Sequence, residues 1–154
     1  MREMRAARGR CGFFGAGDDE GGDVGAVAMS GEILSRHEKG RPGERGWGGR
    51  GNIQFTNVTN AFVRNITSVD SKMFHINLLN CENMTFDQIL INSPLTILNT
   101  DGIHVAHSKG INITNADIKM GTNCVSIHVD SQQINAEKVI CGLGKGINVG
   151  GLGI

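Results

Sequence analysis

Short apolar patterns recur along the second two-thirds of the chain at intervals of 22–27 residues. One pattern places apolar or small residues at positions n, n+2, n+5 and n+7, and its starts, 23, 27 and 23 residues apart, are Ala61, Met84, Ile111 and Ile134. A second pattern has anchors 27, 22 and 22 residues apart, at Ile76, Ile103, Val125 and Ile147. A repeat of this length constrains the fold strongly, because each unit must bury its apolar side against its neighbours.

The texture of the repeats is that of β-strands. From residue 52 onward, apolar residues alternate with Asn, Thr and Ser, and Pro94 is the only proline. Each period holds two or three short strands separated by turns, with no stretch for a helix, which excludes a βαβ unit. Strands one period apart then bury their apolar sides by stacking coil upon coil. The sequence predicts an all-β fold, a right-handed parallel β-helix of about three to four coils over residues 52–154, with the handedness expected of parallel crossovers.

Residues 1–51 follow different rules. They are rich in glycine and arginine, as in Gly40–Gly51, and show no sustained periodicity. Such a segment buries too little apolar surface to offset its ordering entropy, so we expect a low-complexity, flexible segment. An RGG-like nucleic-acid segment is the alternative. We disfavour it because acidic residues interleave with the arginines and the formal net charge of the chain is +0.

Composition excludes several other classes. No segment is long and apolar enough to span a bilayer, so we expect no membrane partner. The first residues lead into no apolar run of signal-peptide length, and we expect no export signal in the chain as written. The four cysteines lack a metal-ligand spacing such as C-x-x-C, so we expect no zinc site and no cofactor.

The repeat also predicts a row of polar residues on the outer face. The residue two positions before an anchor of the second pattern is Asp101, Asn123 or Lys145 in three successive coils. Equivalent residues in adjacent coils lie about 4.8 Å apart. We therefore expect an Asp–Asn–Lys ladder.

Several motifs in this region carry a resemblance to a known family. They are Ser71–Leu79 (SKMFHINLL), Asn99–Val105 (NTDGIHV), Cys124–Ile127 (CVSI), Cys141–Gly142 and Gly144–Gly146 (GKG). In this order they resemble the polygalacturonases of glycoside hydrolase family 28, most closely the plant exo-type enzymes. The resemblance implies a right-handed parallel β-helix and inverting hydrolysis of α-1,4-linked galacturonan in pectin. It also implies secretion to the cell wall or apoplast, a pectin or polygalacturonate partner and a monomer.

The catalytic motifs of that family are degenerate here. Asp101 matches one base-side aspartate, within an intact Asn-Thr-Asp motif. Thr122 stands where the resemblance places the general acid, Asn123 where it places the second base-side aspartate, and Lys145 where it places the histidine. The family's Arg-Ile-Lys motif does not occur before Ile154, so we expect a truncated relative. A threonine hydroxyl is too weak an acid and an asparagine amide too weak a base for this chemistry, so we predict no measurable hydrolysis.

Two alternatives remain open at this stage. The family's activity survives through another acid, or the chain is a non-catalytic pectin-binding protein in which Lys145 and His104 meet a uronate carboxylate. Alternation places His104 on the outer face beside Asp101, and we favour a plain exposed polar residue there. His75 and His107 receive the same interpretation. The remaining aspartate is either a retained base or a structural charge.

The resemblance further suggests a disulfide between Cys124 and Cys141, which are 17 residues apart on successive strand segments. Such a bridge requires an oxidising compartment.

Overall fold

The computed structural model describes the strand segments 7–8, 12–16, 24–28 and 30–35, and residues 51–71, 73–96 and 100–150. All the regular structure in these ranges is β-strand. The strands are β1 (Ala7–Arg8), β2 (Gly12–Ala16), β3 (Val24–Ala28), β4 (Ser30–Ser35), β5 (Gly51–Val69), β6 (Phe74–Leu79), β7 (Glu82–Asn92), β8 (Asp101–Ala106), β9 (Lys109–Lys119), β10 (Asn123–Ile127), β11 (Gln132–Cys141) and β12 (Gly146–Val149). Within the described ranges, no helix has the length and apolar character needed to cross a membrane.

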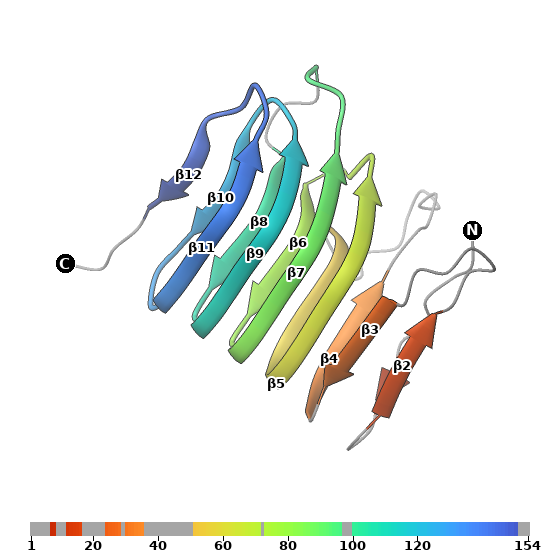
Figure 1. Ribbon diagram of the computed structural model, residues 1–154. Helices are drawn as coiled ribbons and strands as arrows, with labels where there is room; N and C mark the ends of the chain where they lie inside the picture. Colours follow the sequence, from red (N-terminus) through yellow and green to blue (C-terminus); the bar gives the residue numbers. More distant parts are fainter. Residues whose placement is uncertain are drawn as a thin grey trace, which may run out of the picture.

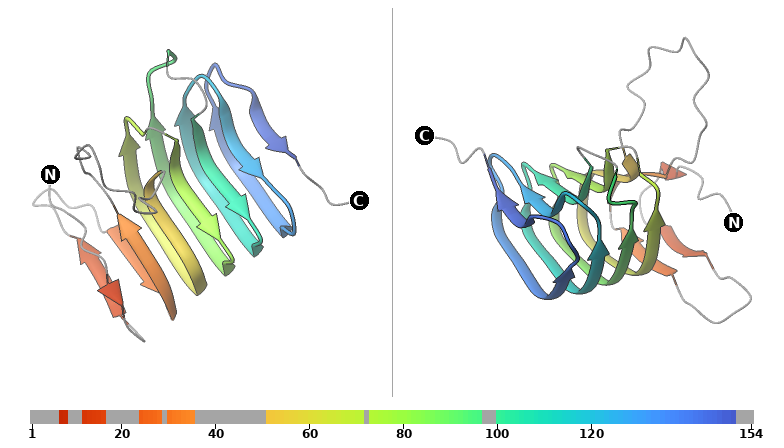
Figure 2. Two further views of the ribbon diagram at one scale, coloured as in Figure 1. Left: turned by 180° about the vertical axis from the view of Figure 1, so that it is seen from behind. Right: turned by 90° about the horizontal axis from the view of Figure 1, so that it is seen from above.

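The strands wind into a parallel β-helix of about four turns (Figure 1). The sheet order is β11-β9-β7-β5-β6-β8-β10-β12, with β5 in the middle because its two halves belong to different faces. Its first half pairs with β6 and its second half with β7, both in parallel. One face is then β5, β6, β8, β10 and β12, and the other is β5, β7, β9 and β11. Figure 2, seen from above, shows the two faces as the sides of one coil.

Both apolar patterns align from coil to coil in the predicted register. Ala61 pairs with Met84, Met84 with Ile111, and Ile111 with Ile134. The anchors of the second pattern align in the same way from β6 to β12. The sequence prediction of a parallel β-helix is therefore confirmed.

A bent corner in each coil explains the uneven spacing of the first pattern. Two residues separate positions n+2 and n+5, and the one at n+4 has a positive φ in every coil: Asn65, Gln88, Asn115 and Lys138, at 58°, 55°, 50° and 53°. A left-handed residue bends the strand, so the next apolar side chain again faces inward. Asparagine tolerates this conformation better than most residues do.

The core consists of the inward positions of these ladders. Phe55, Phe86, Ile113 and Ile118 are fully buried, and the rings of Phe55 and Phe86 meet edge to face with centroids 5.4 Å apart. On β11 the equivalent positions are half-buried or exposed, because no described strand packs beyond β11. The core thus relies mostly on aliphatic side chains from successive coils, in keeping with an aromatic content of 5%.

Four short strands lie within residues 1–51. β3 and β4 pair antiparallel with β5, on the edge of the helix opposite to β12, while β2 pairs with β3 and β1 with β4. The flexible segment predicted for residues 1–51, and the nucleic-acid role that we disfavoured, otherwise fall on residues outside the described ranges.

Candidate functional site

Asp101 begins β8 on the outer face of the helix, and its carboxylate is held by the next coil. Oδ1 accepts a hydrogen bond from Nδ2 of Asn123 at 2.9 Å, and Oδ2 accepts one from Oγ of Ser126 at 2.8 Å. Asn123 and Ser126 lie on β10, one coil away. The predicted contact between the first two members of the polar ladder is therefore present.

This environment weakens Asp101 as a base. Burial alone would raise the pKa of Asp101, but the neighbouring His104 ring and the hydrogen bonds from Ser126 and Asn123 outweigh it and hold the pKa below its ordinary value. A carboxylate of low pKa takes a proton from water less readily. Both of its oxygens are also already engaged, so Asp101 is better suited to orienting its neighbours.

His104 is held by the same network. Nδ1 of His104 lies 3.1 Å from Oγ of Ser126 and 3.9 Å from Oδ2 of Asp101. Ser126 donates its only proton to Asp101, so its oxygen accepts from Nδ1–H, which places a proton on Nδ1 of His104. The side chain of His104 is 16% exposed. The expectation of a plain exposed residue is wrong, because neighbouring coils cover both faces of the ring.

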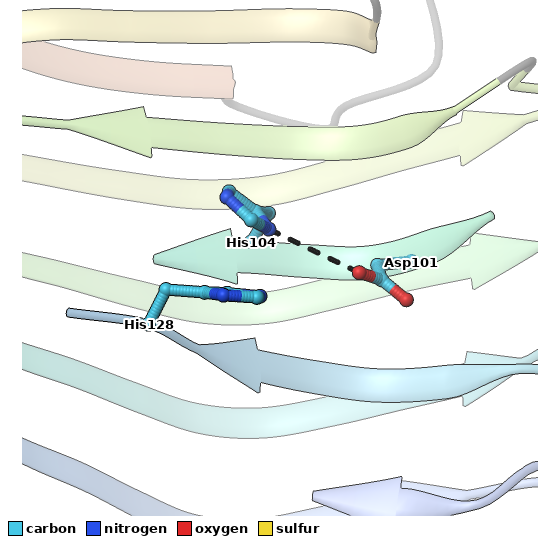
Figure 3. Close-up of side chains that lie close together, drawn as sticks. All are labelled: Asp101, His104 and His128. Atoms are coloured by element: carbon cyan, nitrogen blue, oxygen red, sulfur yellow. Dashed lines mark ion pairs between the residues drawn. The ribbon is translucent and has the colours of Figure 1, made fainter. Parts of the chain in front are cut away.

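The covering groups are two further rings. The ring of Phe74 on β6 has its centroid 4.3 Å from that of His104, and the ring of His128, just after β10, lies 4.5 Å away on the next coil. Burial, and then repulsion from His104, lower the pKa of His128, an effect that Asp101 partly offsets. Figure 3 shows Asp101, His104 and His128 gathered on one face of the helix.

Sequence reasoning missed His128. Ligand-type atoms of Asp101, His104 and His128 all lie within 4.8 Å of one another. His104 is in register with Ser126, not with His128, so a search along ladder positions does not find the second ring. The signal was present in the sequence, because His128 lies only two positions beyond that register partner.

The third member of the predicted ladder is displaced. A bulge at Cys124 aligns Asn123 with Gly146, while Val125 stays aligned with Ile147. Gly146 therefore lies opposite Asn123, and Lys145 lies one position before it, where its backbone N–H donates to the carbonyl of Thr122 at 2.9 Å. The predicted register of Lys145 opposite Asn123 is wrong, because the extra residue in β10 shifts it.

Thr122 and Lys145 differ in how far their polar groups are exposed to solvent. The hydroxyl of Thr122 is buried and has no hydrogen-bond partner in the described structure. The side chain of Lys145 is exposed, and none of the described carboxylates forms an ion pair with it. The threonine is withdrawn from solvent, whereas the lysine charge is free to meet an anion.

The glycines of the motifs are required by close backbone approach. A Cβ at Gly102 would collide with the carbonyl oxygen of Cys124, one at Gly121 would lie 2.7 Å from that of Leu95, and one at Gly144 would collide with that of Thr122. The stacking of the coils thus requires glycine at these three positions. Asn99, from the intact motif, lies outside the described residues.

Cys124 and Cys141 form a disulfide with Cα atoms 5.7 Å apart. The bridge joins β10 to the end of β11, across one coil. Cys81 is a free, buried thiol, and burial raises its pKa above the ordinary value, which makes it a poor nucleophile.

His75 and His107, the other two histidines among the described residues, differ in exposure. His107 is exposed and lies 3.3 Å from a carboxylate oxygen of Asp130, in agreement with the prediction of an exposed polar residue. His75 is fully buried, and its Nδ1 lies 2.9 Å from Oγ of Ser68. The prediction of exposure is wrong for His75, because strict alternation fails at the start of β6, where the adjacent residues His75 and Ile76 are both buried.

The chain is thus a parallel β-helix that carries Asp101 in a hydrogen-bonded network on its outer face. Residues 45–154 match the model of the glycosyl hydrolases family 28. The chain belongs to this family.

Several plant proteins are similar to the chain over about a hundred residues. An exopolygalacturonase of Platanus acerifolia is 50% identical over 102 residues, which are 66% of this chain and 27% of that protein. An exopolygalacturonase of Arabidopsis thaliana is 49% identical over 102 residues, 66% of this chain and 23% of that protein. A polygalacturonase of Gossypium barbadense is 46% identical, with 66% and 25% covered. The chain thus spans about a quarter of the length of the curated relatives that it matches.

Proposed function

We propose that this chain is a polygalacturonase-like β-helix that does not hydrolyse polygalacturonate, the substrate that its family implies. The observation that carries the proposal is the number of carboxylates on the face that holds Asp101. Strands β6, β8, β10 and β12 contribute one carboxylate between them, Asp101 itself.

One carboxylate does not support the chemistry of an inverting glycosidase. That reaction needs an acid for the leaving oxygen and a base for water, in two carboxyl groups about 6.5–9.5 Å apart. Thr122, at the acid position, has a buried hydroxyl. The amide of Asn123 donates to Asp101 and has no basic lone pair to offer water.

The test is reducing-end release from polygalacturonate by the purified chain. Beside it we would assay a triple variant that restores the family's groups, Thr122→Asp, Asn123→Asp and Lys145→His. We expect no turnover by the unmodified chain. Turnover within about 100-fold of the restored variant would refute the proposal, since losing acid–base assistance costs about 10²–10⁴-fold for each group.

The exposed charge of Lys145 favours a second candidate, non-catalytic binding of galacturonan. An ammonium group without a carboxylate partner attracts a uronate as a point charge. Calorimetry with oligogalacturonides tests this, with Lys145→Ala as the variant and Lys109→Ala, an exposed lysine on the other face, as the control. Loss of binding heat in the first variant alone supports this candidate, whereas equal heats in both exclude Lys145 as the contact.

We further propose that the chain acts in the plant cell wall as a monomer. The family and the presence of a disulfide support an oxidising, extracellular compartment. Size-exclusion chromatography with light scattering measures the oligomeric state, and a dimer would refute that part.

A further inference from the structure

The cluster of Asp101, His104 and His128 has a composition that the proposed function does not use. It joins two imidazoles and one carboxylate from two successive coils, with one ligand atom of each within 4.8 Å of the other two. All three side chains are partly exposed, so a small ion can reach them from solvent. No lysine or arginine forms an ion pair with the Asp101 carboxylate within the described part of the chain.

We propose that these three side chains form a binding site for a divalent transition-metal cation such as Zn²⁺ or Co²⁺. Two histidines and a carboxylate are the protein ligands of many open zinc sites, in which water completes the coordination. Imidazole selects this class of ion, whereas Mg²⁺ and Ca²⁺ prefer oxygen ligands. The site stands independently of galacturonan binding.

One pair of ligand atoms already lies near the spacing that a cation requires. Ligand atoms at about 2.0–2.1 Å from Zn²⁺ lie about 3.3 Å apart in a tetrahedral site. Nδ1 of His104 and Oδ2 of Asp101 are 3.9 Å apart, so this pair needs to close by less than about 1 Å. Figure 3 shows His128 extending along the same face, from the coil next to that of the other two residues.

Binding would change one hydrogen bond. Nδ1 of His104 now carries a proton that faces Ser126. For Nδ1 to bind the cation, it gives up that proton, and Ser126 loses one hydrogen bond that it accepts. Ser126 and Asn123 keep donating to Asp101, and such outer hydrogen bonds orient a ligating carboxylate.

The test is titration of the purified full chain with Co²⁺, followed by visible absorption, and with Zn²⁺ by calorimetry near neutral pH. The diagnostic variant is His128→Gln. The matched control is His107→Gln, because His107 is exposed and pairs with a carboxylate of Asp130 but has no third ligand beside it among the described residues. A second diagnostic variant, Asp101→Asn, keeps the size of the side chain and removes its charge.

We expect one cation per chain in the unmodified protein and in His107→Gln. His128→Gln and Asp101→Asn should each bind at least about 100-fold more weakly, since even an outer-shell change costs 10–100-fold. Circular dichroism confirms that a variant keeps its strands, and either diagnostic variant suffices if the other does not fold. Absence of Co²⁺ absorption in the folded chain, or equal affinity in His128→Gln and the unmodified protein, would overturn the proposal.

Discussion

His75 makes the stability of this fold depend on pH in a direction that can be measured. It lies at the start of β6 with its ring fully buried, and its Nε2 has no hydrogen-bond partner among the described residues. Burial lowers the pKa of His75 from 6.5 to about 4, because desolvation outweighs the attraction of the Asp70 carboxylate and the hydrogen bond with Ser68.

The sign follows from which state binds the proton. Between pH 6.5 and about 4 the unfolded chain is protonated at His75 and the folded chain is not. Folding stability therefore falls as the pH falls through this window, by about 1.4 kcal/mol for each step of one in pH, or about 3 kcal/mol over the whole window. Asp87 and Asp101, whose pKa values lie below 3.8, add their own loss of stability only at lower pH.

Urea unfolding at several pH values between about 7.5 and 4.5 measures this dependence. We expect His75→Gln to flatten most of the slope. The pH dependence of stability that remains comes from His128. Its pKa is also lowered in the folded chain, so its protonation likewise reduces stability as the pH falls. The exposed His107 provides the control variant His107→Gln. Parallel stability profiles for the unmodified chain and His75→Gln would refute the assignment of this proton to His75.

Three further changes test the packing. Gly102→Ala places a Cβ against the carbonyl oxygen of Cys124 and should lower the free energy of unfolding by about 2–3 kcal/mol in urea titrations. Gly150→Ala, where the new Cβ would lie 3.8 Å from the side-chain nitrogen of Asn148, should change it little. Phe86→Ala empties a fully buried position and should cost about 3–5 kcal/mol in the same assay. Reducing the disulfide between Cys124 and Cys141 opens a loop of sequence separation 17 and should cost about 3 kcal/mol, read from thermal unfolding with and without dithiothreitol.

Each of these has an outcome that contradicts it. Equal stability of Gly102→Ala and Gly150→Ala would mean that the coil relaxes around the new methyl group. A loss below about 1 kcal/mol for Phe86→Ala would mean that neighbouring coils collapse into the space. An unchanged melting temperature on reduction would mean that the bridge does not constrain the unfolded chain.

The fold could be predicted because the apolar residues that must be buried recur with the period of the coils. Inward positions such as Met84 and Ile111 must stack, so a recurring apolar pattern fixes the register without knowledge of the loops. The corners were implicit in the extra residue between n+2 and n+5, since a straight strand would have kept alternating. The structure adds the cause, a left-handed residue such as Asn65 at that point.

The site was harder to predict because it depends on departures from the period. The bulge at Cys124 places Gly146, and not Lys145, opposite Asn123, and the spacing of the repeats does not predict a bulge. His75 is buried near the start of β6, and His128 meets His104 just after the end of β10. The alternation of inward and outward side chains holds within strands and fails at their ends. Most of the polar side chains of the candidate site lie near such strand ends.

The stacking of coils also gives the molecule a direction of mechanical weakness. Each coil on the main path of the sheet is hydrogen-bonded only to the coil before it and the coil after it. Tension applied to the two ends would therefore peel the helix from an end, one coil at a time, releasing about 80 Å of chain for a coil of about 23 residues. The bridge between Cys124 and Cys141, of sequence separation 17, prevents the segment between them from extending. Unfolding of the coil that contains this segment would therefore release roughly 60 Å less chain until the bridge is reduced.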